Sequence, residues 1–80
     1  MEKGICLSGL VEKIKIVKLE ENPLIRFTLA SDEGTKVNCL IGLHALHFLY
    51  QVNEGSAVVV FGQKNSRNQI VVKKYHVKAA

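Results

Sequence analysis

The chain has 80 residues, 48% of them hydrophobic, so it is long enough for one small domain with a core and too short for two. Eleven Lys and Arg against seven Asp and Glu give a net charge of +4, which favours polyanions such as nucleic acid, although a small domain also carries such a charge without any partner. Two cysteines exclude a disulfide framework. The first ten residues do not resemble a secretion signal and the apolar runs are too short for a membrane span, so we expect a cytoplasmic protein with no membrane partner.

The first predicted strand is long, from Ile5 to Leu19, and is rich in Ile, Val and Leu. Gly9 interrupts this strand, and a glycine inside a strand often marks a bulge or a sharp bend, which a small barrel needs in order to close. Neither face of the strand is cleanly apolar beyond Leu10, so the alternation does not assign its inward face. Pro23, which cannot donate in a central ladder, ends the turn that follows.

The next two strands are predicted at Leu24–Ala30 and Thr35–Ile41, joined by a hairpin turn at Ser31–Gly34. Their side chains alternate between apolar and polar, as in strands with one buried face. The faces that we assign to the core carry Ile25, Phe27, Leu29, Val37, Cys39 and Ile41.

A short helix is predicted over Leu43–Val52, because apolar residues recur there at helical spacing. Gly55 would end the segment in a left-handed cap. The stripe expected to face inward consists of Ala45, Leu46, Phe48, Leu49 and Val52. The solvent-facing side of the helix would carry His44, His47 and Gln51.

Two further strands, Ala57–Gln63 and Gln69–Val77, flank a polar hairpin at 65–68. The order strand-strand-strand-helix-strand-strand is that of an OB-fold, so we predict an all-β, five-stranded OB-fold barrel with one short helix between strands three and four, as a single domain over residues 1–80. A two-layer α/β sandwich is the alternative. The lack of a long helix or parallel crossover favours the barrel.

Two segments resemble the bacterial single-stranded DNA-binding protein family. Phe27–Ser31 (FTLAS) looks like that family's second strand, and Gly55–Gln63 (GSAVVVFGQ) is similar to its G-S-x-V-x-V-x-G-Q fourth strand. The step from Ile41-Gly42 into the predicted helix is also similar. The resemblance implies the barrel and, as an expectation, binding of single strands.

The chain also departs from that family. It has no Trp, its hairpin loops are short, and its last residues, Val77–Ala80, carry no acidic partner-binding tail. In these respects it looks closer to primosomal replication protein N, a dimeric branch that relies more on lysines than on aromatic stacking.

The expected binding surface crosses the second and third strands, flanked by the loops after the first and fourth. A single strand needs cations for its phosphates and flat faces for its bases. The residues that we expect on this surface are Lys15, Lys18, Arg26, Thr28, Lys36, Asn38, Lys64, Arg67 and Tyr75. Alternatively, the lysines only deter edge aggregation and Tyr75 is a half-buried strand residue.

The predicted strand Ala57–Gln63 points Val59 and Phe61 outward by alternation. An outward Val-Phe pair on a barrel wall favours a subunit contact, so we expect a homodimer with these two residues in its interface. The other interpretation is that Phe61 stacks a base.

No catalytic residue, cofactor or metal site is predicted. The acidic residues fall mostly in turns, and no glycine-rich phosphate loop opens a helix. His44 and His47 share a helix face, but a structural zinc site needs four ligands in recognisable pairs. Cys6 and Cys39 are both expected to be buried and inert.

These patterns predict a non-enzymatic, weakly sequence-specific single-stranded nucleic-acid-binding protein, accessory to DNA replication, recombination or mobile-element maintenance. The sequence does not separate DNA from RNA as the partner. The alternative is an OB-fold protein-interaction or assembly subunit, which the lack of tryptophan favours. Nucleic-acid binding should weaken steeply with salt, and an apolar assembly contact should not.

Overall fold

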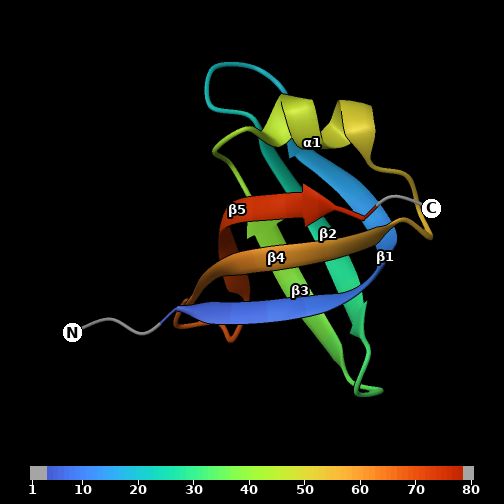
Figure 1. Cartoon of the computed structure of the whole chain (residues 1–80). Coiled ribbons are helices and arrows are strands. Elements are labelled where there is room, and N and C mark those ends of the chain that lie inside the picture. Colours follow the sequence, from blue (N-terminus) through green and yellow to red (C-terminus); the bar gives the residue numbers. More distant parts are fainter. Residues whose placement is uncertain (1–3, 79–80) are drawn as a thin grey trace.

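Five strands close into a barrel in the computed structural model, which describes residues 4–78 (Figure 1). The single helix of this part, α1, lies between the third and fourth strands. The predicted five-stranded OB-fold barrel is therefore confirmed, while residues 1–3 and 79–80 of the predicted domain lie outside the described part. The elements are β1 (Ile5–Lys18), β2 (Leu24–Ser31), β3 (Lys36–Ile41), α1 (Ala45–Gln51), β4 (Ala57–Lys64) and β5 (Ile70–Val77).

The strands follow the order β1-β2-β3-β5-β4 around the barrel, and β4 pairs again with β1. All pairs are antiparallel except β3 with β5, which run parallel. β1 takes part in two ladders: its first half pairs with β4 and its second half with β2. A strand that serves two sheets must bend, and this bend is what allows so small a barrel to close.

The two ladders of β1 overlap at Gly9, which pairs with Ser31 on β2 and with Val58 on β4. A Cβ at Gly9 would lie 2.2 Å from the carbonyl oxygen of Ala30, so only glycine allows the two backbones to approach this closely. Of the two features that Gly9 was expected to mark, a bulge or a sharp bend, the bulge lies further along the strand, where the register shifts between Glu12 and Lys15.

That register shift determines which side chains of β1 point into the barrel. Before it, Val11 pairs with Leu29 and is fully buried, whereas Glu12 faces outward with Thr28. Lys13 adopts a positive φ of 51°, and after it Lys15 faces outward beside Arg26. A bulge adds one residue and so switches the inward face from odd to even positions. This switch explains why neither face of the segment looks apolar in the sequence.

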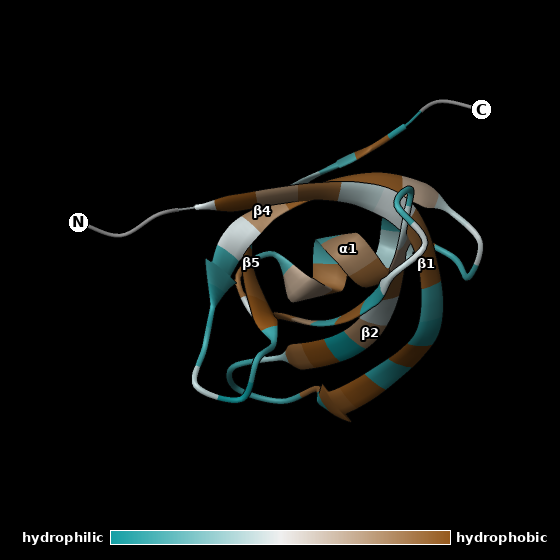
Figure 2. Ribbon diagram, turned by 90° about the horizontal axis from the view of Figure 1, so that it is seen from below, coloured by the Kyte–Doolittle hydropathy of each residue, from teal (hydrophilic) through white to brown (hydrophobic). Residues whose placement is uncertain are grey.

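The helix covers one end of the barrel, as seen through the ring of strands in Figure 2. Phe48 of α1 stacks on Phe27 of β2 with ring centroids 4.7 Å apart, which fixes the helix to the core. α1 is shorter than predicted, and Leu46, expected inward, is 52% exposed. The expectation for Leu46 was wrong because so short a helix buries only a narrow line of residues, Ala45 and Phe48.

The two cysteines differ in environment. Cys39 is fully buried on β3, and burial raises the pKa of its thiol to about 12. Cys6 is exposed, because it lies on the outward face of β1 opposite Phe61. The prediction that both thiols are buried is therefore wrong for Cys6.

We expect one fast-reacting thiol per folded chain at pH 8. With a pKa of about 12, only about one Cys39 in ten thousand is a thiolate at that pH, and the thiolate is the nucleophile. Titration with a chromogenic disulfide should thus detect Cys6 at once and Cys39 only after guanidinium unfolding. A Cys6→Ser variant should lose the fast phase. Equal rates for both thiols in the folded protein would contradict the burial of Cys39.

Within residues 4–78, no helix has the length and apolar character that crossing a membrane would require.

Candidate nucleic-acid interface

The outer face of β2 and β3 is polar, because their apolar side chains alternate into the barrel. Arg26 and Thr28 project outward from β2, and Asn38 projects outward from β3 opposite Thr28. The hydroxyl of Thr28 donates to Oδ1 of Asn38 over 3.4 Å, which leaves the amide group of Asn38 able to donate elsewhere. Lys15 extends this face onto β1, since it pairs with Arg26.

These side chains surround a hollow of about 290 Å³, the strand groove, lined by Lys13, Lys15, Arg26, Phe27, Thr28 and Asn38. Three of the lining residues are cations and none is acidic. The sequence did not predict Lys13 as a binding residue, because regular strand alternation gives no reason to place it beside Lys15 and Arg26. The bulge at Lys13 brings the three cations together. The strand groove therefore combines positive charge with hydrogen-bonding groups, as a path for a phosphate backbone requires.

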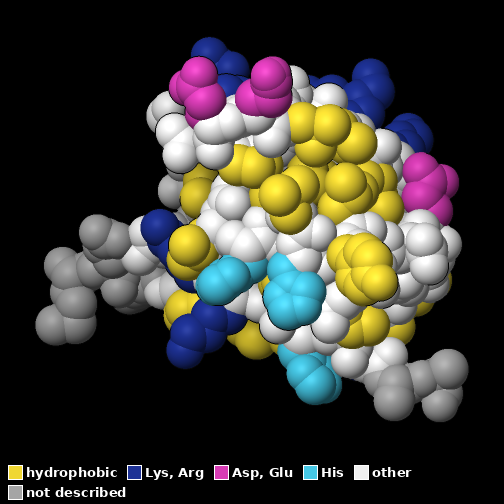
Figure 3. All heavy atoms as spheres, turned by 90° about the horizontal axis from the view of Figure 1, so that it is seen from above, with side chains coloured by type: hydrophobic (Ala, Val, Ile, Leu, Met, Phe, Trp, Pro, Cys, Tyr) yellow, Lys and Arg dark blue, Asp and Glu magenta, His cyan; other side chains and the backbone are white. Residues whose placement is uncertain are grey.

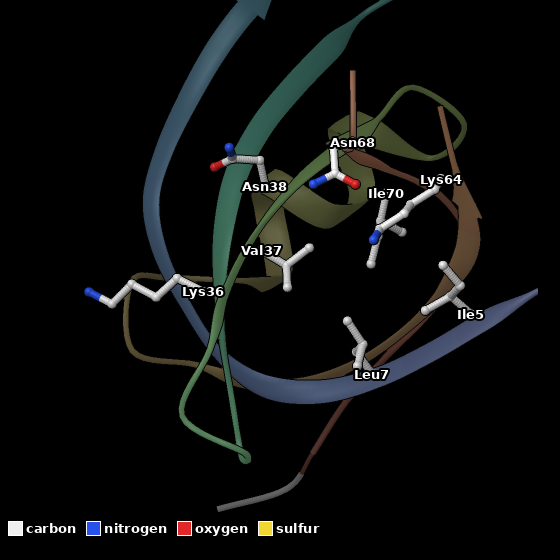
Figure 4. Close-up of a pocket in the computed structure, with 8 residues that line it drawn as sticks. All are labelled: Ile5, Leu7, Lys36, Val37, Asn38, Lys64, Asn68 and Ile70. Atoms are coloured by element: carbon white, nitrogen blue, oxygen red, sulfur yellow. The ribbon is translucent and has the colours of Figure 1, made fainter. Parts of the chain in front are cut away.

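A second hollow of about 300 Å³, the mouth pocket, adjoins the strand groove and shares Asn38 with it. Figure 4 shows that its lining residues come from β1, β3, β4, β5 and the hairpin before β5. Together the two hollows collect most of the predicted binding residues. The mouth pocket is lined by Ile5, Leu7, Lys36, Val37, Asn38, Lys64, Asn68 and Ile70.

The cations of this surface are not equally available. Nζ of Lys36 lies 3.2 Å from Oε1 of Glu12, with both side chains partly exposed. This is the only ion pair within residues 4–78, so Lys13, Lys15, Arg26 and Lys64 have no acidic partner there. An exposed pair of this kind contributes little to stability, but it places a negative charge beside the binding surface.

Two predicted cations lie outside both hollows. Lys18 is at the end of β1, where it pairs with Leu24. Arg67 is in the β4–β5 hairpin, exposed, and its backbone N–H donates to Oδ1 of Asn65 over 2.9 Å. Neither residue lines the strand groove or the mouth pocket.

Tyr75 packs against the helix. Its hydroxyl donates to Oε1 of Gln51 over 2.9 Å, and its ring meets Phe48 edge-on at 5.1 Å. Burial raises the pKa of the Tyr75 hydroxyl. Tyr75 is therefore a half-buried strand residue, as the alternative interpretation expected, and it lines neither hollow.

Val59 and Phe61 face outward on β4, as predicted. Phe61 is 43% exposed, and its ring lies over Gly4, where a Cβ would come within 2.4 Å of it. On either side β4 pairs with β1 and β5, so these residues occupy a different wall of the barrel from the strand groove.

The end of the barrel covered by α1 carries exposed hydrophobic side chains beside histidines (Figure 3). Leu43 is 62% exposed, Leu46 52% and Tyr50 91%. Among the residues that the structure describes, no three His, Cys, Asp or Glu side chains gather in a way that could hold a metal ion.

No family model matches the chain, and no curated protein matches it. Solved structures do. The mitochondrial single-stranded DNA-binding protein Rim1 of S. cerevisiae matches with a TM-score of 0.81 and 16% identity, covering 98% of this chain and 96% of that one. A small single-stranded DNA-binding protein of Streptomyces coelicolor matches with a TM-score of 0.76 and 18% identity, covering 98% and 94%.

The yeast Stn1 and Ten1 structure matches with a TM-score of 0.76 and 17% identity, over 96% of this chain and 43% of that one. At such identities the likeness establishes the fold. The solved structures that resemble this chain thus include single-stranded DNA-binding proteins, and the resemblance predicted from FTLAS and GSAVVVFGQ is confirmed at the level of the barrel.

Proposed function

We propose that this protein binds single-stranded nucleic acid along the strand groove and the mouth pocket. The observation that carries the proposal is a continuous outer face on which Lys13, Lys15, Arg26 and Lys64 have no acidic partner within residues 4–78. Lys13, Lys15 and Arg26 can follow phosphates, while Thr28 and Asn38 offer hydrogen bonds between them. The likeness to two single-stranded DNA-binding proteins, from S. cerevisiae mitochondria and from Streptomyces coelicolor, supports the same function.

Binding of this kind is weakly sequence-specific overall, since phosphate contacts carry no sequence information. It requires no catalytic group, and we propose an accessory cytoplasmic role in replication, recombination or mobile-element maintenance. RNA is an alternative ligand, because phosphate contacts do not distinguish the two sugars.

Fluorescence anisotropy of a labelled dT oligonucleotide of about 20 nucleotides, longer than one OB-fold covers, tests the proposal. Unlabelled single-stranded DNA, single-stranded RNA and duplex DNA serve as competitors. We expect binding at low salt, with single strands competing better than duplex. Folded protein that leaves the anisotropy unchanged at low salt would refute the proposed function.

The second candidate is a protein-interaction subunit, favoured by the exposed apolar side chains around α1 (Figure 3). An apolar contact gains little from low salt. Absence of oligonucleotide binding, together with salt-insensitive self-association or partner binding, would favour this candidate.

Replacing Glu12 by Gln should tighten binding to single strands about two- to threefold at low salt. The change removes the carboxylate that pairs with Lys36 over 3.2 Å and repels phosphates nearby. Anisotropy titrations of both proteins at the same salt measure the difference. Glu33→Gln, at an exposed turn position outside both hollows, is the control with the same charge change. Weaker binding by Glu12→Gln would show that phosphates do not approach this part of the face.

We also propose that the protein is a homodimer with Val59 and Phe61 in the interface. Phe61→Glu should then convert the dimer to a monomer, because it places a charge at the centre of an apolar contact. Light scattering at several protein concentrations measures the mass. A wild-type protein that is monomeric throughout, or a variant of unchanged mass, would contradict this interface.

A further inference from the structure

The mouth pocket differs from the strand groove in having an apolar floor. Ile5 and Leu7 come from β1, Val37 from β3 and Ile70 from β5. Ile70 is fully buried, whereas the other three are only partly covered. Aliphatic side chains left open at the edge of a positively charged surface suit a flat, partly apolar group better than a phosphate.

The floor is open because of the strand pairing. β1 pairs with β2 only from Gly9 onward, and the register of β3 with β5 begins only at Cys39. In the described ladders, the start of β1 and the start of β3 therefore do not pair with each other. The side chains of Ile5, Leu7 and Val37 line the gap between these two strand starts and are not sealed inside the core.

Polar side chains stand over this floor from one side. In Figure 4, the Lys64 side chain reaches across Ile70 and Asn68 lies beside it, whereas Lys36 points away from the pocket. The direction of Lys36 agrees with its ion pair to Glu12. Lys64 and Asn68 thus form a local pair of hydrogen-bonding groups at the rim of the pocket.

The rim is held in place by the backbone of the hairpin. Asn68 adopts a positive φ of 63°, which asparagine tolerates, and its N–H donates to the carbonyl of Asn65 over 3.1 Å. Oδ1 of Asn65 also accepts from the N–H groups of Arg67 and Gln69, each at 2.9 Å. Within residues 4–78 the carboxamide of Asn68 makes no hydrogen bond, so it is available to a ligand.

We propose that the mouth pocket takes one nucleobase of the bound strand, and that it prefers a base with a carbonyl oxygen at pyrimidine C4 or purine C6: thymine, uracil or guanine. The proposal rests on the proposed function and adds a single selective position to it. A hollow of about 300 Å³ is at the small end of ligand sites, which fits one base better than a larger group. Because the pocket shares Asn38 with the strand groove, a strand in the groove continues directly into it.

The preference follows from the charge on Lys64. An ammonium group only donates, so it is satisfied by a carbonyl oxygen such as thymine O4 or guanine O6. Cytosine and adenine carry an amino group at the same position, so the Lys64 ammonium would face another hydrogen-bond donor there. The carboxamide of Asn68 both donates and accepts, so it can complete the edge of either keto base.

The experiment compares a 15-nucleotide dC strand with the same strand carrying one central dT, by anisotropy at constant salt. We expect the single dT to tighten binding about tenfold, the size of one good base contact. Lys64→Met and Asn68→Gly should reduce this ratio to about twofold; glycine is chosen at position 68 because it also accepts a positive φ. Arg26→Gln, in the strand groove, should weaken both strands and leave the ratio unchanged.

The outcomes separate the two proposals. If the wild type binds both strands equally well, or if Lys64→Met and Asn68→Gly retain the full ratio, the pocket is not a base site, although the proposed function stands. If folded wild type binds neither strand, the proposed function itself fails and the pocket proposal fails with it.

Discussion

Lys15→Glu combined with Arg26→Glu is expected to weaken binding to a single-stranded oligonucleotide by about 100-fold at low salt. The two residues are cross-strand neighbours, both exposed, and both line the strand groove. Each reversal removes a phosphate contact and adds a repulsive charge, and two such changes together are worth roughly 3 kcal/mol. Lys36 is a poorer target because Glu12 already engages it.

The matched control for this variant is Lys73→Glu combined with Lys74→Glu. These exposed β5 lysines lie outside both hollows, so the control changes the net charge equally without touching the proposed site. Anisotropy titrations measure the affinities, and circular dichroism confirms that each variant is folded. Equal loss in both variants would mean that net charge alone attracts the oligonucleotide and that the strand groove has no special role.

Gly9→Ala is expected to destabilise the fold by about 3 kcal/mol or more, which is a large part of the stability of a domain this small. The new Cβ would lie 2.2 Å from the carbonyl oxygen of Ala30 and 2.8 Å from Cα of Ser31. Both are backbone atoms of β2, so no side chain can move aside to relieve the clash. The loss should appear in urea unfolding followed by circular dichroism, and as a lower melting temperature.

Gly42→Ala is the control for the loss of a glycine as such. A Cβ there would meet its nearest atom, the carbonyl oxygen of Pro23, at an ordinary 3.7 Å, so we expect a change within about 0.5 kcal/mol. Gly62→Ala, with a Cβ 2.0 Å from the carbonyl oxygen of Val71, should resemble Gly9→Ala. Similar stabilities for the variants at positions 9 and 42 would show that β1 and β2 can separate without cost.

The barrel could be predicted from the sequence because most of its strands alternate regularly. Ile25, Phe27 and Leu29 repeat with the period of a strand, and all three are fully buried. β1 could not be oriented in the same way, since the bulge at Lys13 reverses its inward face within the strand. The sequence does carry a trace of this bulge. Inward-facing apolar residues such as Leu7 and Val11 lie at odd positions before it, and apolar residues lie at even positions after it.

The candidate site was partly predictable for the same reason. Arg26, Thr28 and Asn38 lie together because alternation places them outside β2 and β3. The packing of Tyr75 depends on where α1 rests against the barrel, and the accessibility of the mouth pocket depends on where β1 and β3 separate. Both are long-range properties that no local pattern records.

The most direct test of the account is the salt dependence of affinity for a single-stranded dT oligonucleotide. With Lys13, Lys15 and Arg26 as phosphate contacts, the logarithm of the association constant should fall linearly with the logarithm of salt concentration, with a slope of about −2. Lys15→Glu with Arg26→Glu should flatten this slope. An affinity that does not change with salt, or no binding by folded protein at low salt, would contradict the central claim that this barrel holds a single strand by its phosphates.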